Sequence, residues 1–459
     1  MNENNNNTIN RRRFFGLMGS GAAVTAASLA GCSSEKQRAV TTLPAEVPTD
    51  KMTYRYMPDS DAKVSLLGYG MMRLPEIDKE LQEEGKNHLD QEEINRLVDY
   101  ALAHGVNYFD TSPRYCKGFS EQSVGIALSR HKRSDYIVAT KLSNFSPETQ
   151  SFQASVQMYH DSFKNLQVDY IDYYLLHSIG ELENYRQRYI DNGVLDFLVK
   201  EREAGRIKYL GWSFHGSKEF FDYMLNEQPV KFDFVQIQMN YKDWKHSDPS
   251  AEYMYNELAK RNIPVVIMEP LLGGGLAKVN HKVLAMFQRV DPSLTPAYWA
   301  FRFCGHFPKV LTVLSGMTYM EHLQENIRTY SPLQPLSEEN LAMLDRAANI
   351  IAEFPEIGCT RCQYCMPCPY GLNIPAIFHH YNKCINEGTF ADSTQADDYK
   401  QNRRAFLIGY DRSVPRLRQA DHCVGCEICL PKCPQHINIP QEMQKIDKYV
   451  EYLKQNPID

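Results

Sequence analysis

The stretch Asn107-Tyr-Phe-Asp110-Thr-Ser-Pro-Arg-Tyr115 contains the repeating unit of this chain, a short apolar run that ends on a carboxylate and passes into a polar turn. Seven similar runs lie between Val64 and Ser315, and a segment with helical spacing follows each one. Eight such pairs over about 270 residues are typical of an α/β fold, the (β/α)8 or TIM barrel. The predicted strands are 64–68, 107–110, 136–141, 171–177, 209–213, 234–240, 265–269 and 310–315, and the predicted helices are 91–104, 121–130, 148–165, 193–204, 218–226, 251–261, 295–303 and 320–330.

A doubly wound open sheet is the competing architecture, but no Gly-x-Gly-x-x-Gly follows an early strand.

The length and charge of the chain limit the classes of function it can have. The chain has 459 residues and a formal net charge of -6, from 50 basic and 56 acidic side chains with no long run of one sign. It is therefore long enough for several domains, and it lacks the basic patch of a nucleic-acid-binding protein. Small molecules and redox partners are the expected ligands.

Four ionisable side chains lie where predicted strands end. Asp110, Lys141 and His177 close three consecutive strands, and Tyr115 follows in the loop after Asp110. Because the carboxyl ends of barrel strands meet at one mouth, these candidate catalytic residues are expected to converge there. A lysine ammonium would lower the pKa of the tyrosine, the aspartate would hold that lysine, and the histidine would orient a substrate oxygen. Charged strand ends also occur as structural ion pairs, so spacing alone leaves that alternative open.

These residues stand in motifs that resemble the aldo/keto reductase superfamily, over residues 51–335. The resemblance implies reduction of a carbonyl or oxidation of an alcohol, with Tyr115 as general acid, Lys141 and Asp110 as its tuners and His177 as the residue that orients the substrate. The motifs that carry it are Asn107 to Tyr115, Gly118-Phe-Ser-Glu121, Ala139-Thr-Lys141, Asp169-Tyr-Ile-Asp172-Tyr-Tyr-Leu-Leu-His177 and Gly211-Trp-Ser213.

The same resemblance implies a nicotinamide dinucleotide at the barrel mouth. Glycines suit its phosphates, because backbone N–H groups approach a phosphate closely where no side chain intervenes. NADH is favoured over NADPH, since residues 317–320 carry no cation for a 2'-phosphate, although Arg328 could supply one. The residues implied as contacts are Ser213, Gln236 or Gln238, and Asn240 near the ring, Pro270, Gly273, Gly274 and Gly275 around the pyrophosphate, and Gly316, Glu325 and Asn326 near the adenosine.

Twelve cysteines occur in the chain, and eight of them fall in 359–368 and 423–433, which we call the first and second cysteine-rich segments. Three closely spaced thiolates can reach one iron-sulfur cube, and a fourth before proline reaches the other cube. The spacing therefore predicts one [4Fe-4S] cluster on Cys359, Cys362, Cys365 and Cys433, and a second on Cys368, Cys423, Cys426 and Cys429.

The first segment departs from the usual spacing, because two residues instead of three precede its last cysteine. Structural zinc prefers separated cysteine pairs, and disulfides do not require a Cys-Pro repeat, so these alternatives fit less well. Cys116, Cys304 and Cys384 have no partner motif and are expected to be ordinary thiols. The stretch 268–276 followed by this tail, and the stretch 212–215, are similar to the iron-sulfur branch of the superfamily.

The first 32 residues have the features of an export signal. Arg11-Arg12-Arg13-Phe14 resembles the twin-arginine signal, and Leu29-Ala-Gly-Cys32 resembles the lipobox of bacterial lipoproteins. We therefore expect export by the twin-arginine route to the periplasmic or cell-envelope side of a membrane, with Cys32 as a lipid anchor. An uncleaved anchor helix is the alternative, and residues 33–50 would form a tether.

The sequence thus predicts a signal (1–32), a tether (33–50), a barrel (51–335) and a small, mainly helical ferredoxin-like two-cluster domain (336–459). The expected protein is an exported oxidoreductase that acts on a small carbonyl or alcohol, with clusters that exchange electrons with an unidentified redox partner. Two alternatives remain open. One is an electron-transfer protein whose barrel is a docking platform, and the other is a sugar-modifying enzyme that retains its nicotinamide.

Overall fold

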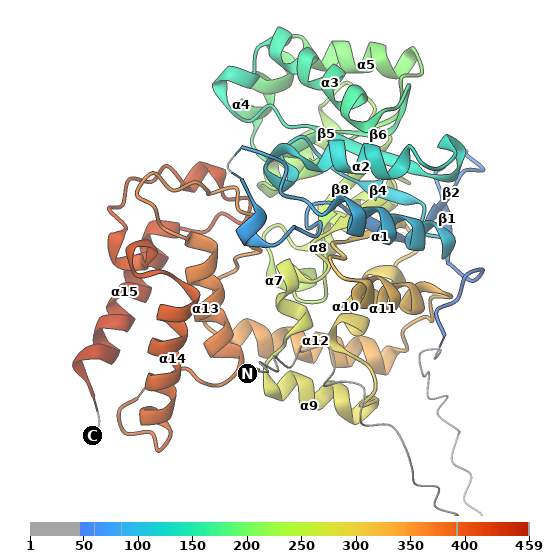
Figure 1. Ribbon diagram of the computed structural model, residues 1–459. Coiled ribbons are helices and arrows are strands. Elements are labelled where there is room, and N and C mark those ends of the chain that lie inside the picture. The colour runs from blue at the N-terminus through green and yellow to red at the C-terminus, as the bar shows by residue number, and fades with distance from the viewer. Residues whose placement is uncertain (1–45, 59, 84, 392, 458–459) are drawn as a thin grey trace, which may run out of the picture. The chain divides into compact units, whose positions relative to one another are not determined.

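The computed structural model describes residues 46–58, 60–83, 85–391 and 393–457 (Figure 1). The predicted export signal, the lipidation site at Cys32 and the first part of the tether lie outside these residues. Within the described ranges, no helix combines the length and the apolar character that crossing a membrane requires.

In the described part of the chain, eight parallel strands close into a barrel, which confirms the predicted (β/α)8 architecture. Each strand pairs with the next along the chain, and the last pairs with the first. The register sets Asp110 beside Gly70 on one side and Ala139 on the other, so the strand ends are level there. The barrel strands are β3 (Leu67–Gly70), β4 (Tyr108–Asp110), β5 (Ile137–Leu142), β6 (Ile171–Ile179), β7 (Ile207–Phe214), β8 (Phe234–Gln238), β9 (Val265–Met268) and β10 (Val310–Ser315).

The first predicted strand, 64–68, is wrong in its limits, because the structure divides it between two sheets. β2 (Lys63–Ser65) forms an antiparallel hairpin with β1 (Tyr54–Tyr56), and the barrel strand begins only at Leu67. Ser65 accounts for the break. Its backbone N–H donates to Asn107 Oδ1 at 2.9 Å and its hydroxyl donates to the Leu67 carbonyl at 2.7 Å, so side chains satisfy hydrogen bonds that a continuous strand would have made with backbone.

The interior of the barrel is a packed core. Tyr108, Tyr173 and Phe234 lie in it, and consecutive rings meet edge to face with centroids 5.1 and 5.0 Å apart. Met57 and Val64, from the hairpin region, belong to the same cluster. Since side chains fill the interior, chemistry is left to the carboxyl ends of the strands, as in other barrels of this type.

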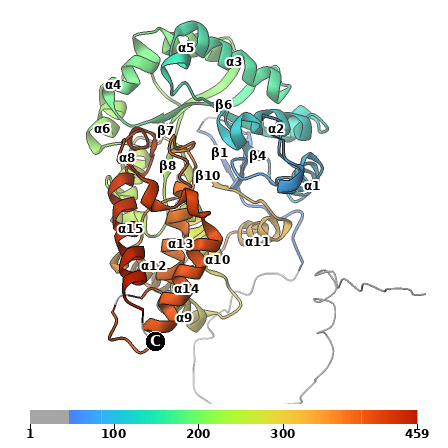
Figure 2. The same ribbon diagram turned by 60° about the vertical axis from the view of Figure 1, so that its left-hand side comes forward.

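Helices surround the strands and share one large hydrophobic core with them (Figures 1 and 2). Short polar residues begin many of these helices. Asp90, Ser151, Ser217 and Ser250, for example, each accept a backbone N–H from the first turn. The helices of this layer are α1 (Gln91–Ala103), α2 (Ser120–Leu128), α3 (Phe152–Leu166), α4 (Leu182–Tyr185), α5 (Val194–Glu203), α6 (Lys218–Asn226), α7 (Asp243–His246), α8 (Ala251–Lys260), α9 (His281–Val290), α10 (Pro296–His306) and α11 (Met320–Tyr330).

The chain after the barrel contributes to two different cores. α12 (Glu338–Glu353) belongs with the barrel, because its buried residues join the large core and Asp345 pairs with Lys245 at 2.6 Å. α13 (Ile374–Asn386), α14 (Tyr399–Ser413) and α15 (Ile439–Gln455) form a second core, against which cysteines of both segments pack (Figure 2). α13 and α14 lie between the two cysteine-rich segments in the sequence and α15 follows the second, so these three helices support both segments.

Candidate active site

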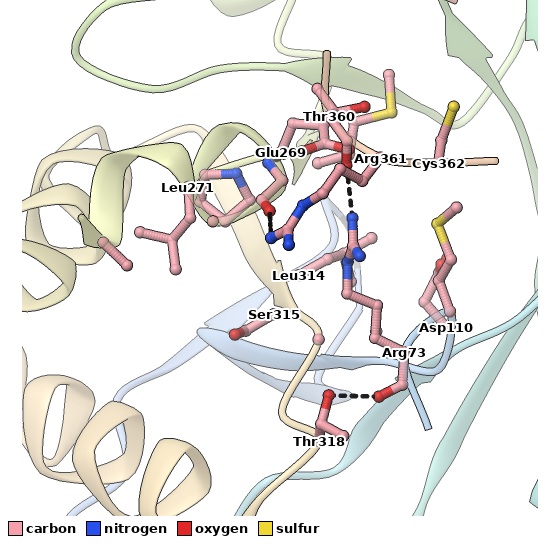
Figure 3. A pocket seen from close by; sticks show the side chains of 18 of the residues that line it. Arg73, Asp110, Glu269, Leu271, Leu314, Ser315, Thr318, Thr360, Arg361 and Cys362 are labelled. Atoms are coloured by element: carbon pink, nitrogen blue, oxygen red, sulfur yellow. Dashed lines mark hydrogen bonds between the residues drawn. The ribbon is translucent and has the colours of Figure 1, made fainter. Parts of the chain in front are cut away.

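A cavity of about 680 Å³ opens at the carboxyl ends of the barrel strands. Asp110, Tyr115 and His177 line it from the barrel, and Cys362 and Tyr364 line it from the first cysteine-rich segment. Figure 3 shows side chains from both regions around the same space. The cavity is therefore shared between the barrel and the cysteine-rich part of the chain.

The ends of β4 and β5 hold a buried ion pair. Lys141 Nζ donates to Asp110 Oδ1 at 2.6 Å and to the Thr111 carbonyl at 2.8 Å. The lysine and aspartate side chains are only 1% and 2% exposed. Burial lowers the pKa of Lys141 and raises that of Asp110, and the attraction between the two groups opposes both shifts. The pair fixes the ammonium group 4.8 Å from the centre of the Tyr115 ring.

Tyr115 begins a short 3-10 turn, Tyr115–Gly118, and its side chain is 8% exposed. Its pKa departs from the sequence-based expectation that Lys141 would lower it. Burial raises the pKa of Tyr115 well above its usual value, and nearby Tyr364 and Asp110 act in the same direction. Loss of solvent around the hydroxyl is thus the main cause of the shift. A raised pKa keeps the hydroxyl protonated near neutral pH, which is the form that can donate a proton.

His177 faces Tyr115 across the cavity, with the two rings edge to face and their centroids 6.0 Å apart. Burial, and next the charge of Lys141, lower the pKa of His177 well below its usual value, so its imidazole is neutral near pH 7. Nδ1 lies 2.6 Å from Ser143 Oγ, which orients the ring. Nε2 lies 3.4 Å from the Tyr364 hydroxyl. The nitrogen on the cavity side is therefore placed to hydrogen-bond an oxygen there.

Tyr364 is a candidate functional residue that the sequence did not reveal. It stands between Cys362 and Cys365, yet its hydroxyl reaches His177 and its ring centroid lies 6.0 Å from that of Phe145. The cysteine spacing predicted only a cluster loop. Tyr364 and His177 are 187 positions apart, so their contact depends on how the segment folds onto the barrel. The one local signal was an aromatic residue between two predicted ligands.

Most residues that the resemblance assigned to a dinucleotide lie together in the cavity. Gln238 and Asn240 do not line it, because both donate to Asp243 Oδ2, at 2.7 and 2.8 Å, and Gly275 also lies outside the lining. Gln236 is the clearest ligand contact, since its buried Oε1 has no hydrogen-bond partner among the described residues. Such an acceptor fits an amide donor on a ligand. The predicted residues that line the cavity are Ser213, Gln236, Pro270, Gly273, Gly274, Gly316, Glu325 and Asn326.

The glycine-rich turn Leu272–Ala277 follows β9 and meets the first cysteine-rich segment. Gly273 and Gly274 have φ angles of 63° and 96°, which glycine adopts without strain. A Cβ on Gly273 would lie 2.3 Å from the Thr360 carbonyl oxygen, so only glycine permits the contact. Arg361 Nη2 donates to the Gly273 carbonyl at 2.6 Å (Figure 3). The predicted phosphate cradle and the cysteine-rich segment are therefore in direct contact.

The eight predicted cluster ligands lie in two groups of four. In each group the last cysteine of one segment joins the first three of the other, which is the crossed arrangement that the spacing predicts. Within the described residues, no three His, Cys, Asp or Glu side chains stand where they could hold a single metal ion. The first small cavity is lined by Cys359, Cys362, Cys365 and Cys433, and the second by Cys368, Cys423, Cys426 and Cys429.

The barrel is the part of this chain that the family model matches. The model of the aldo/keto reductase family matches residues 66–349 and ends before the first cysteine-rich segment. Protein tas from Escherichia coli is 25% identical over 350 residues, which cover 64% of this chain and 97% of that protein. L-galactose dehydrogenase from Arabidopsis thaliana is 24% identical over 309 residues, which cover 62% of this chain and 90% of that protein.

A solved structure shows the same fold. An aldo-keto reductase from Klebsiella pneumoniae, in complex with NADPH, superposes with a TM-score of 0.50 at 21% identity. The match covers 64% of this chain and 94% of that one. At this level of identity the likeness concerns the barrel fold alone, and it adds to the family match over residues 66–349.

Proposed function

The chain belongs to the aldo/keto reductase family, and from this premise we propose that it interconverts a small carbonyl compound and its alcohol with a bound nicotinamide dinucleotide. As a member of this family it is an oxidoreductase. The observation that carries the proposal is the convergence of Asp110, Tyr115, Lys141 and His177 at one mouth. Lys141 Nζ lies 2.6 Å from Asp110 and 4.8 Å from the Tyr115 ring centre, and His177 faces that same ring.

Tyr115 acts as the proton donor in reduction. Its raised pKa keeps the hydroxyl protonated, and it gives up the proton as a carbonyl oxygen becomes a more basic alkoxide. The Lys141 ammonium stabilises the phenolate that remains, while Asp110 keeps that ammonium in place. His177, which is neutral, orients the same oxygen through Nε2. When bound, the nicotinamide supplies or accepts the hydride.

The dinucleotide would be held by the predicted residues that line the cavity. Two observations support this assignment: the unpartnered Oε1 of Gln236, and the NADPH bound by the Klebsiella pneumoniae relative. We retain the preference for NADH, because residues 317–320 carry no cation. Titration of the full-length protein with each dinucleotide tests this preference, and tighter binding of NADPH would contradict it.

Replacement of Tyr115 by phenylalanine tests the proposed reaction. The variant keeps the ring and loses only the hydroxyl, so we expect kcat to fall by about 10²–10⁴-fold with dinucleotide binding unchanged. Tyr56→Phe, at a side chain that is 52% exposed, is the matched control and should leave kcat unaltered. Unchanged electron transfer in Tyr115→Phe, together with no carbonyl turnover in the native protein, would favour the electron-transfer protein whose barrel is a docking platform.

We also propose that the two cysteine groups bind two [4Fe-4S] clusters. A cube of irons and sulfides holds four thiolates around a space larger than a single ion needs, which agrees with four cysteines around each small cavity. The backbone N–H of Arg361 also lies 3.4 Å from Cys359 Sγ, a contact common around cluster ligands. When bound, such clusters exchange single electrons, here with an unidentified redox partner. Anaerobically purified protein should contain about eight irons and eight acid-labile sulfides per chain, whereas zinc without sulfide would contradict the proposal.

Export by the twin-arginine route, lipidation of Cys32 and a separate ferredoxin-like cluster domain are further parts of the proposal. Arg11-Arg12-Arg13-Phe14 and the lipobox-like stretch ending at Cys32 support export. A folded-protein route suits cargo whose clusters are assembled before export. Fractionation of cells that express the native chain and an Arg11→Lys, Arg12→Lys double variant tests the route, and unchanged localisation of the variant would count against it.

A sugar-modifying enzyme that retains its nicotinamide is the second candidate, and the similarity to L-galactose dehydrogenase favours a sugar as its substrate. Mass analysis of small molecules released from the purified, denatured protein separates the two candidates. Stoichiometric NAD(H) in protein prepared without added cofactor supports retention, and its absence supports a freely exchanging cofactor.

A further inference from the structure

Two arginines in the cavity take no part in the chemistry described so far. Arg73 follows β3, and Arg361 stands next to Cys362 in the first cysteine-rich segment. Both line the cavity together with Gly274 and Gly316 of the predicted dinucleotide site. Figure 3 shows their guanidinium groups side by side, although the two residues are 288 positions apart in the sequence.

Each arginine is held in place by a hydrogen bond to a backbone carbonyl in another part of the chain. Arg73 Nη2 donates to the Thr360 carbonyl at 2.6 Å, and Arg361 Nη2 donates to the Gly273 carbonyl at 2.6 Å. The barrel arginine thus bonds to the cysteine-rich segment, and the arginine of that segment bonds to the glycine-rich turn. A guanidinium group has five N–H donors in a planar fork, so donors remain for a ligand after these bonds.

Both arginines also pack against glycines of the predicted dinucleotide site. A Cβ on Gly274 would lie 3.1 Å from Arg361 Nη2, and one on Gly316 would lie 3.3 Å from the Arg73 side chain. These distances are tighter than ordinary side-chain contacts, so the glycines allow the arginines to approach the backbone closely. Arg361 therefore lies beside a glycine predicted at the pyrophosphate, and Arg73 lies beside a glycine predicted near the adenosine.

Among the carboxylates that line the cavity in the described structure, Glu269 attracts both arginines and also accepts the Gly273 N–H at 2.6 Å. Asp110 is engaged by Lys141 at 2.6 Å and Glu325 accepts from the Thr295 hydroxyl, so one carboxylate faces two guanidinium groups and the pair keeps a net positive charge. Two adjacent guanidinium groups repel one another, and an anion between them removes that repulsion. Phosphate oxygens suit this arrangement best, because the guanidinium fork matches phosphate geometry.

We propose that Arg73 and Arg361 bind phosphate oxygens of the dinucleotide, so that the cysteine-rich segment completes a site that the barrel begins. This inference rests on the nicotinamide cofactor of the proposed function. If the phosphate bound is the 2'-phosphate, the cation not found at 317–320 is supplied from elsewhere in the chain, and the preference for NADH is overturned. The phosphate could be the pyrophosphate, present in NADH and NADPH, or the 2'-phosphate of NADPH.

Binding of NADH and NADPH to the full-length, anaerobically purified protein tests the inference. Dissociation constants are measured by nicotinamide fluorescence for the native chain and for Arg73→Gln, Arg361→Gln and Arg361→Lys. We expect each glutamine variant to weaken binding roughly tenfold or more, because a charge-assisted hydrogen bond is lost, and the lysine variant to weaken it less. Equal losses for the two dinucleotides assign the pyrophosphate, and a loss confined to NADPH assigns the 2'-phosphate.

Arg418→Gln is the matched control. Arg418 lies between the two cysteine-rich segments in the sequence and, like the other two arginines, donates to a backbone carbonyl, that of Gly371 at 3.2 Å. It is exposed, however, and does not line the cavity. It should bind both dinucleotides as the native chain does. Iron and sulfide content, measured for every variant, shows that the adjacent Cys362 site is intact. Native-like affinity in both Arg73→Gln and Arg361→Gln overturns this inference alone, whereas a native chain that binds neither dinucleotide overturns the proposed cofactor as well.

Discussion

The barrel mouth and the cysteine-rich segments position their reactive side chains in different ways. At the mouth, Asp110 and Lys141 stand in neighbouring strands whose hydrogen-bond ladder fixes the register, and both are at most 2% exposed. In the segments, the cysteines stand in turns between strained residues such as Gln363, with a φ of 65°, and Cys426 is exposed. Strand register and burial position the reactive groups of the first region, whereas local turn geometry positions the cysteines of the second.

The two regions meet at the residues between Cys359 and Cys365. Arg361 and Tyr364 of that stretch reach the glycine-rich turn and His177, respectively, while the flanking cysteines face a separate small cavity. One short stretch therefore serves both regions. This arrangement allows a change in one region to be tested for its effect on the other.

The largest combined effect on turnover and stability is expected from Lys141→Met, which removes the buried ion pair of the barrel mouth. Loss of the ammonium should lower kcat about 10²–10³-fold. It should also lower the free energy of unfolding by about 3–5 kcal/mol, because Asp110 is left buried without its partner. Burial raises the pKa of Asp110, so the folded variant takes up a proton more readily than the unfolded chain as pH falls. The stability deficit should therefore shrink at lower pH, as denaturant titrations over a pH series would measure.

Lys245→Met is the control for this comparison. Lys245 pairs with Asp345 at the same distance of 2.6 Å, but these side chains are 51% and 42% exposed. Its loss should change the free energy of unfolding by less than about 1 kcal/mol at every pH. Equal losses for the two lysine variants would mean that burial is not what distinguishes the barrel pair.

Two substitutions, Cys433→Ser and Cys368→Ser, distinguish the two predicted groups of four cysteines. Each should reduce iron and sulfide by about half, since each removes one ligand from one cluster. Only Cys433→Ser should alter dinucleotide binding, because its group includes Cys362, which lines the cavity of the barrel mouth. If each segment instead held its own cluster, Cys368→Ser would be the variant that disturbs dinucleotide binding.

The sequence predicted those features that depend on local order or on fixed spacing. The barrel followed from the alternation of strands and helices, and the convergence of Asp110, Lys141 and His177 followed from their positions at strand ends. The crossed grouping of the cysteines followed from their spacing before proline. The first strand was misplaced because the side chain of Asn107 binds Ser65, a contact across 42 positions that no local pattern indicates.

Features that depend on packing could not be predicted in this way. The direction of the Tyr115 pKa shift is set by how completely neighbours exclude water from the hydroxyl, and a nearby lysine in the sequence says nothing about that. The contacts of Tyr364 and Arg361 arise only when the segment folds onto a barrel that ended many residues earlier. α12 looked like part of the final domain by its position, yet its apolar side chains pack in the barrel core.

The smallest expected effect tests the contact between the regions. In Tyr364→Phe the hydroxyl that lies 3.4 Å from His177 Nε2 is removed, and that nitrogen becomes free for a substrate oxygen. We expect KM for the carbonyl substrate to fall by roughly fivefold, with kcat almost unchanged, because one weak hydrogen bond no longer competes with the substrate. Tyr370→Phe is the control, since Tyr370 is 51% exposed and lies just after the same segment. A rise in KM or a fall in kcat would show instead that the Tyr364 hydroxyl binds the substrate itself, and the cysteine-rich segment would then belong to the substrate site as well as to the cluster region.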